Sequence, residues 1–291
     1  GVSGFVSTGL QLRGRERAGR ISMRQCFARR IRRIMPAAVT TIAMTTALSF
    51  LILSPSRANA TLGDGFFASI FLANWRFAAG GTDYFATALG VSPLQQFWTL
   101  SVEEQFCLVW PLLLIAVLAI AAAAAAKAGK QLTTTTQRRI LAGVLIPIVA
   151  ASLIWSIVET ATAPSVAYFA TASRIWELGA GALLAVGAPL FTRLETKART
   201  ILAIVGLVGI LASMVLLTEA SPVPGPLAII PVLATAALLA SGIGGANALQ
   251  RPLAHGALFT FPGQPGCHVD GVHLRASRQI GGEHHAVEAP G

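Results

Sequence analysis

The sequence is short of charged residues. Of its 291 residues only 12% are charged and 54% are hydrophobic, whereas a soluble domain usually carries about 25% charged residues. The mean hydropathy of +0.66 agrees with this bias. With so little charge, a folded chain could not cover its surface with polar groups, which excludes an ordinary soluble, a disordered or a disulfide-rich secreted protein. We therefore predict an all-α bundle that crosses a membrane several times.

Cysteine and histidine are also scarce. The cysteines Cys26, Cys107 and Cys267 are odd in number and unrelated in spacing, which predicts neither a disulfide framework nor a CxxC metal site. No histidine precedes His255, and the five histidines all lie in the last 37 residues. Their spacing there matches no zinc pattern. We therefore expect no metal site and no resident cofactor.

Six apolar stretches are long enough to cross a bilayer core of about 30 Å, which needs roughly 20 helical residues. These predicted spans are 34–53, 97–126, 140–158, 172–190, 201–217 and 227–243. Residues 1–12 are typical of the closing half of an earlier span. Segment 66–75 is too short to cross unless it is tilted or re-entrant, and counting it as a span would invert every later helix.

The placement of basic residues predicts the topology. The net charge of +10 comes from 22 Lys and Arg against 12 Asp and Glu. Nine arginines precede the first span, and the later connections hold two, four, none, three and none basic residues. This alternation fits the positive-inside rule. We therefore predict a cytoplasmic-membrane protein with residues 13–33, 127–139 and 191–200 in the cytoplasm, and no nucleic-acid partner.

Four arginines at the mouth of the first span form a dense basic cluster. They are Arg29, Arg30, Arg32 and Arg33, and Pro36 follows where it would fit the first turn of a helix. One interpretation is a stop-transfer cluster whose side chains reach the lipid headgroups. The other is a binding surface for a phosphorylated cosubstrate, because the guanidinium fork matches phosphate oxygens.

Two adjacent acids open the second predicted span. Ser101 is followed three residues later by Glu104, which is a capping-box pattern, and both Glu103 and Glu104 would favour a helix N-terminus. Capping does not explain two acids at the mouth of a membrane span, where one would suffice. We therefore keep Ser101 as a predicted cap and both glutamates as candidate catalytic residues.

Arg174 and Glu177 lie within a third apolar region. A spacing of three residues places them on one helix face and predicts a mutual ion pair. The pair could hold the bundle together or line a polar pocket on a substrate path, and both alternatives stay open. The nearby Gly179 and Gly181 would permit close helix approach.

Read in order, several motifs resemble the acyltransferase 3 family of integral-membrane O-acyltransferases, which is related to bacterial O-antigen, peptidoglycan and macrolide acylation. The matching segments are 2–5, 19–22, 29–36, 74–75, 83–85, 92–94, 97–111, 174–179 and 247–253. The most specific is Trp-Thr-Leu-Ser-Val-Glu-Glu-Gln-Phe at 98–106. The resemblance covers residues 1–258.

The resemblance implies that an acyl group, usually acetyl, passes from cytoplasmic acyl-CoA to a hydroxyl of an envelope glycan or glycolipid. The four clustered arginines, on the predicted cytoplasmic side, suit the donor. The catalytic candidates Glu103, Glu104, Arg174 and Glu177 fall near the predicted outer ends of their helices and suit the acceptor. The implied partners are the lipid bilayer, acyl-CoA as cosubstrate and envelope carbohydrate.

Two departures from the family pattern matter. The family's catalytic histidine, with an upstream arginine, lies in a first membrane helix that would precede residues 2–5, so we expect this chain alone to be a poor or inactive catalyst. Residues 259–291 resemble nothing in the family and are expected to be a disordered or frameshifted tail. The alternatives are a multi-span transporter lined by the Arg174–Glu177 pair and an inactive remnant of an acyltransferase.

Overall fold

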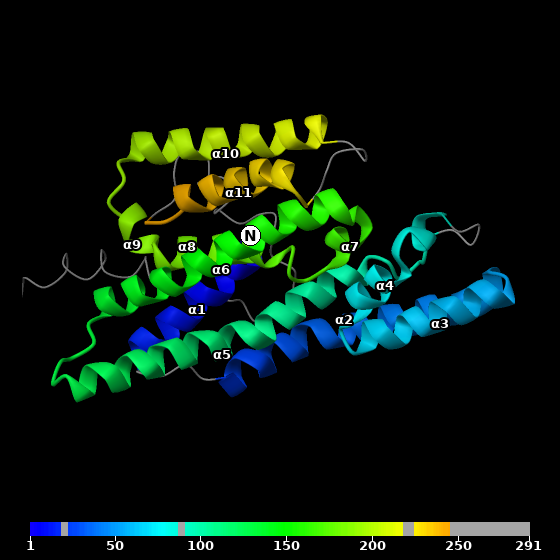
Figure 1. The fold of residues 1–291 in the computed structure, drawn as a ribbon, viewed down its shortest axis with the longest axis horizontal. Helices are drawn as coiled ribbons and strands as arrows, with labels where there is room; N and C mark the ends of the chain where they lie inside the picture. The colour runs from blue at the N-terminus through cyan, green and yellow to red at the C-terminus, as the bar shows by residue number, and fades with distance from the viewer. Residues whose placement is uncertain (19–22, 87–90, 218–223, 245–291) are drawn as a thin grey trace, which may run out of the picture. The chain divides into compact units, whose positions relative to one another are not determined.

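The computed structural model describes residues 1–18, 23–86, 91–217 and 224–244, which belong to a compact unit of residues 1–251. These residues form helices and no strand, which confirms the all-α prediction (Figure 1). The elements are α1 (Val2–Ala18), α2 (Met23–Ile52), α3 (Pro55–Ser69), α4 (Ala73–Ala86), α5 (Phe97–Lys127), α6 (Thr134–Thr162), α7 (Pro164–Phe169), α8 (Ile175–Val186), α9 (Ala188–Phe191), α10 (Thr196–Leu216), the 3-10 turn η1 (Pro226–Ala228) and α11 (Ile229–Ser241). The predicted tail and the motifs at 19–22 and 247–253 lie outside the described residues.

Four helical segments are long and apolar enough to cross a membrane. They are Arg30–Ile52, Phe97–Lys127, Thr134–Thr162 and Thr196–Leu216, and each coincides with a predicted span. The other two predicted spans correspond to the shorter apolar helices Ile175–Val186 and Pro226–Ser241. Four full-length spans are therefore supported, and six remains a prediction.

No continuous helix covers residues 66–75. Helix α3 ends at Ser69, α4 begins at Ala73, and between them Phe71 adopts a φ of 56°. A positive φ is unfavourable for a bulky side chain and interrupts regular helix geometry. The structure thus agrees with leaving this segment out of the predicted spans.

The outward faces of the long helices are apolar. Leu112 and Ile120 on α5, Ile154 on α6 and Met214 on α10 are exposed to the surroundings of the bundle. Soluble proteins rarely expose such continuous apolar surface, whereas lipid tails solvate it without cost. The exposed apolar faces therefore favour a membrane environment.

Helix α5 carries the core on one face. Its buried side chains recur every four residues, a spacing that places them in one row along a helix. The row consists of Trp98, Val102, Phe106, Trp110, Leu114 and Leu118. Within it the indole N–H of Trp110 donates to the hydroxyl of Thr8 over 2.7 Å, and both residues are buried. That bond joins α1 to α5.

Glycines allow the close helix contacts predicted from the sequence. A Cβ on Gly179 would lie 2.5 Å from Val149 Cγ2 on α6, and one on Gly181 would collide with the backbone of α1. On α1, a Cβ at Gly4 would collide with the Leu178 carbonyl of α8. The prediction for Gly179 and Gly181 is therefore confirmed. Helices α10 and α11 run side by side (Figure 1). A Cβ on Gly206 of α10 would lie 2.7 Å from the backbone nitrogen of Leu238 on α11.

Two predictions about helix starts are wrong. Helix α2 begins at Met23, so Pro36 lies inside it rather than in its first turn. Arginine is a good helix former, and it extends the helix well before the apolar stretch begins. Helix α5 begins at Phe97 with Gln96 at the N-cap position, so Ser101 lies inside the helix. Its hydroxyl donates to the Phe97 carbonyl over 2.9 Å and caps nothing.

Candidate functional site

The first polar cluster joins the arginine-rich segment of α2 to the acidic pair of α5. Arg30 Nε donates to both carboxylate oxygens of Glu104, over 2.7 and 2.9 Å. Arg30 Nη2 also lies 4.0 Å from Glu103 Oε2. The Glu104 side chain is 17% exposed and that of Glu103 is 44% exposed. Glu104 is therefore the engaged carboxylate, and Glu103 is the more accessible one.

This contact corrects the predicted arrangement of the site. We expected the arginine cluster on the cytoplasmic side of the membrane and the two glutamates near the outer side, but the direct contact puts the side chains of Arg30 and Glu104 at one level. Hydropathy and charge counts locate the ends of spans but carry no information on how neighbouring helices are offset, so this contact could not be foreseen.

The other predicted donor-binding arginines differ from Arg30. Arg32 and Arg33 are exposed, and the side chain of Arg29 lies outside the described residues. The cluster is therefore divided between one arginine held inside the bundle by a carboxylate and at least two whose guanidinium groups are accessible.

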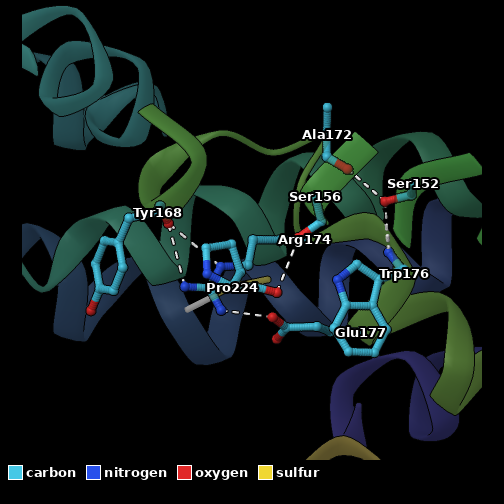
Figure 2. Close-up of polar contacts among 8 residues, drawn as sticks. All are labelled: Ser152, Ser156, Tyr168, Ala172, Arg174, Trp176, Glu177 and Pro224. Atoms are coloured by element: carbon cyan, nitrogen blue, oxygen red, sulfur yellow. Dashed lines mark hydrogen bonds and ion pairs between the residues drawn. The ribbon is translucent and has the colours of Figure 1, made fainter. Parts of the chain in front are cut away.

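The second polar cluster surrounds Arg174, which lies just before α8 (Figure 2). Its Nη1 atom lies 2.6 Å from Glu177 Oε1, so the predicted ion pair is confirmed. Its Nε and Nη2 atoms each lie 3.4 Å from the Tyr168 carbonyl oxygen. The guanidinium carbon also lies 5.2 Å from the centre of the Trp98 ring and 5.3 Å from that of Tyr168. One guanidinium group is thus fixed by a carboxylate, a carbonyl and two aromatic faces.

Side chains of α6 hold the backbone around Arg174 and, through Ser156, the segment before α11 (Figure 2). The Ser152 hydroxyl donates to the Ala172 carbonyl over 2.5 Å and accepts from the Trp176 amide over 3.0 Å. Ser156 donates to the Pro224 carbonyl over 3.0 Å. Ser173, which is fully buried, donates to the carboxylate of Glu159. The segment that carries Arg174 is therefore anchored on both sides of that residue.

A third polar cluster, missed by the sequence analysis, links the two just described. It consists of the side chains of Asn74 on α4, Gln105 on α5 and Thr171 in the α7–α8 connection. Gln105 Nε2 donates to Asn74 Oδ1 over 2.8 Å, Asn74 Nδ2 donates to Thr171 Oγ1 over 2.9 Å, and the Thr171 hydroxyl donates to Gln105 Oε1 over 2.6 Å. The sequence feature that could have revealed this cluster is the presence of amide side chains within apolar stretches, where polar residues are rare.

Helix α5 brings the clusters together. It supplies Trp98 to the Arg174 cluster, Gln105 to the amide network and Glu104 to the Arg30 contact. The structure thus places Arg30, Glu103 and Glu104 in one cluster and Arg174 and Glu177 in another, with α5 contributing to both. In the described part of the chain, no group of three His, Cys, Asp or Glu side chains could hold a metal ion.

Comparison with known proteins assigns the chain to a family. A family model described as "Acyltransferase domain" matches residues 1–261. The peptidoglycan O-acetyltransferase OatA of Listeria monocytogenes is 28% identical over 216 residues, which are 72% of this chain and 32% of that protein. YrhL of Bacillus subtilis, provisionally named a peptidoglycan O-acetyltransferase, is 27% identical over 65% of this chain and 28% of its own length. SACOL0978 of Staphylococcus aureus, provisionally named an O-acetyltransferase, is 25% identical over 74% of this chain and 33% of its own length.

The chain spans about a third of the length of these curated relatives. No solved structure matches it significantly. The family match covers the helices that carry all three polar clusters, and it agrees with the resemblance carried by the motifs at 29–36, 97–111 and 174–179. The chain therefore belongs to the acyltransferase 3 family of acyltransferase domains.

Proposed function

We propose that this chain forms the membrane part of an O-acyltransferase that passes an acyl group, acetyl in the first instance, from cytoplasmic acyl-CoA to a hydroxyl of an envelope glycan or glycolipid. In this proposal the chain lies in the cytoplasmic membrane, with residues 13–33, 127–139 and 191–200 on the cytoplasmic side. The observation that carries the proposal is the contact of Arg30 with Glu104. Acyl transfer requires donor and acceptor to meet at one place, and this contact supplies a charged centre inside the bundle.

The donor side of the proposal rests on the divided arginine cluster. Arg32 and Arg33 are exposed and lie within one helical turn of Arg30. Guanidinium groups bind phosphate oxygens through paired, charge-assisted hydrogen bonds. We assign Arg32 and Arg33 to the phosphates of acyl-CoA, with Arg29 as a further candidate. Arg30, which is held by Glu104, then lies between the phosphate contacts and the acidic pair.

The chemistry needed is a substitution at a thioester. The acceptor hydroxyl oxygen bonds to the acyl carbonyl carbon, the carbon–sulfur bond breaks, and coenzyme A leaves as a thiolate that takes up the proton lost by the hydroxyl. Glu104, oriented by Arg30, is proposed to hold the acceptor hydroxyl by accepting its hydrogen bond, with Glu103 as the more exposed neighbour. Arg174, with its fixed guanidinium, is proposed to stabilise negative charge that develops during transfer.

The acceptor class rests on the relatives. Two of them carry names that specify peptidoglycan O-acetylation, so a glycan hydroxyl is the acceptor that we propose to test first. Because the chain covers about a third of each, the acceptor, the acyl chain and the partners belong to the proposal.

The test is transfer of labelled acetyl from acetyl-CoA to purified peptidoglycan by membrane vesicles containing the full-length gene product. Label that becomes base-labile glycan ester is the expected result, and vesicles with Glu104→Gln should give little. Vesicles that bind the donor but transfer nothing would support the inactive-remnant alternative. Vesicles that neither bind acetyl-CoA nor transfer its acetyl group would contradict the proposal.

A further inference from the structure

We propose that Asn74, Gln105 and Thr171 form a positioning network that fixes Glu104 relative to Arg174 during acyl transfer. The inference rests on the proposed function and adds three residues that contact no substrate. Gln105 is the chain neighbour of Glu104, and Thr171 lies three residues before Arg174. A rigid link between Gln105 and Thr171 is therefore a link between the two charged clusters.

The hydrogen bonds of the network are fully satisfied. Gln105 Nε2 donates to the Phe71 carbonyl and to Asn74, each over 2.8 Å. Asn74 Nδ2 donates to Thr171 over 2.9 Å and to the Phe169 carbonyl over 3.3 Å. The Thr171 hydroxyl both accepts from Asn74 and donates to Gln105. Every amide hydrogen and oxygen thus has a partner, so the network admits one orientation of each side chain.

The network also explains two irregular pieces of backbone. Phe71 lies in the break between α3 and α4, where its carbonyl has no helical partner and accepts from Gln105 instead. Phe169 ends α7 and is fully buried, and its carbonyl accepts from Asn74. Asn74 itself is 0% exposed. The side chains therefore tie α4, α5 and the α7–α8 connection together at the positions where helical bonding is interrupted.

A positioning role follows from what lies at each end of the network. Arg174 contacts Trp98 of α5 through its side chain, and the Thr171–Gln105 bond is the hydrogen bond that ties the backbone segment before Arg174 to α5, beside the ring contacts of Trp98 with Tyr168 and Phe169. Reacting groups need a nearly fixed geometry, and a displacement of about 1 Å can lower a rate by about 100-fold. Loss of one network bond should therefore slow transfer more than it weakens donor binding.

The test compares Thr171→Val with Thr171→Ser in the full-length gene product in membrane vesicles. Valine keeps the shape of threonine and removes the hydroxyl, whereas serine keeps the hydroxyl. We expect Thr171→Val to lower kcat for acetyl transfer about 10- to 100-fold, with the Kd for acetyl-CoA changed less than about twofold, and Thr171→Ser to retain most of the rate. Thr162→Val, which removes an exposed hydroxyl on α6, is the matched control and should behave as the wild type.

If Thr171→Val does not accumulate in membranes, Gln105→Met takes its place, because it keeps about the same side-chain length and removes the amide without burying a charge, and a wild-type rate in that variant would overturn the network as well. A wild-type rate in the hydroxyl-free variant, or an equal loss of rate in Thr171→Val and Thr171→Ser, would overturn the network. A wild-type protein that transfers no acetyl group would instead overturn the proposed function, and this inference with it. The two failures are thus distinguished by the wild-type rate alone.

Discussion

Arg30 and Glu104 are 74 residues apart in the chain, and their side chains lie 2.7 Å apart between α2 and α5. The contact joins the most basic motif of the chain to its most acidic one. Because the two residues have side-chain exposures of only 22% and 17%, their attraction is screened less than that of a surface pair. It therefore gives the bundle a defined charged centre.

The first prediction concerns the charge of Glu104. Glu104→Gln should leave Arg30 with a neutral partner and lower the free energy of unfolding by about 1.5–3 kcal/mol, the range for a hydrogen bond to a charged group. Acetyl transfer should fall strongly. The measurements are the unfolding midpoint in detergent and the transfer rate. Glu103→Gln is the matched control, because its side chain is 44% exposed, and it should change stability little. Equal effects of the two substitutions would contradict the assignment of Glu104 as the engaged acid.

The second prediction separates the arginines by their exposure. Arg32→Ala and Arg33→Ala should leave stability nearly unchanged, since both side chains are exposed, and each should weaken acetyl-CoA binding about tenfold, which corresponds to about 1.4 kcal/mol. Arg30→Ala should instead lower stability, because it leaves the Glu104 carboxylate without its partner. Equilibrium binding of labelled acetyl-CoA to vesicles measures the first effect. If acetyl-CoA binding is unchanged in the Arg32 and Arg33 variants, the arginine cluster only sets the membrane topology.

The third prediction concerns the shape of the Arg174 side chain. Arg174→Lys keeps the charge but loses the planar group that contacts Glu177, the Tyr168 carbonyl and two aromatic faces at once. Transfer should fall by about tenfold or more while the protein still inserts. Arg193→Lys, at an exposed position after α9, is the control and should be silent. A fully active Arg174→Lys variant would show that positive charge alone is sufficient there.

The fourth prediction tests the packing of α1 against α8. A Cβ at Gly4 would collide with the Leu178 carbonyl, whereas one at Gly14 on the same helix meets no atom within 4 Å. Gly4→Ala should lower the unfolding free energy by about 1–3 kcal/mol through overpacking. Gly14→Ala should raise it by about 0.5–1 kcal/mol because alanine favours the helix. Unfolding midpoints in detergent that shift in the same direction for both variants would contradict the observed contact.

Much of the fold was predictable, because span length and hydropathy depend on local sequence. Four predicted spans coincide with long apolar helices, and the rejected segment 66–75 is broken at Phe71. The Arg174–Glu177 ion pair was also predictable, since a spacing of three residues sets it within one helical turn. Helix starts were harder: arginines extended α2 beyond its apolar part, and α5 began a turn before Ser101.

Which polar side chains meet between helices could not be predicted. The Arg30–Glu104 pair depends on the axial offset of α2 and α5, and the Asn74–Gln105–Thr171 network depends on a break in the backbone at Phe71. Neither the axial offset of two helices nor a break in the backbone produces a periodic pattern of residues in the sequence. The aromatic contacts of Arg174 with Trp98 and Tyr168 could not be predicted either. They depend on how α5 and α7 are placed relative to the start of α8.

The most direct test of the central claim, that Arg30 and Glu104 act together at one acyl-transfer centre, is a double-mutant cycle on the transfer rate. Acetyl transfer from labelled acetyl-CoA to peptidoglycan is measured for the full-length gene product, for Arg30→Gln, for Glu104→Gln and for the double variant. We predict that each single variant loses most of the rate and that the double variant is no slower than the slower single variant, because residues that act as a unit do not contribute additively. Losses that simply add in the double variant would contradict the claim.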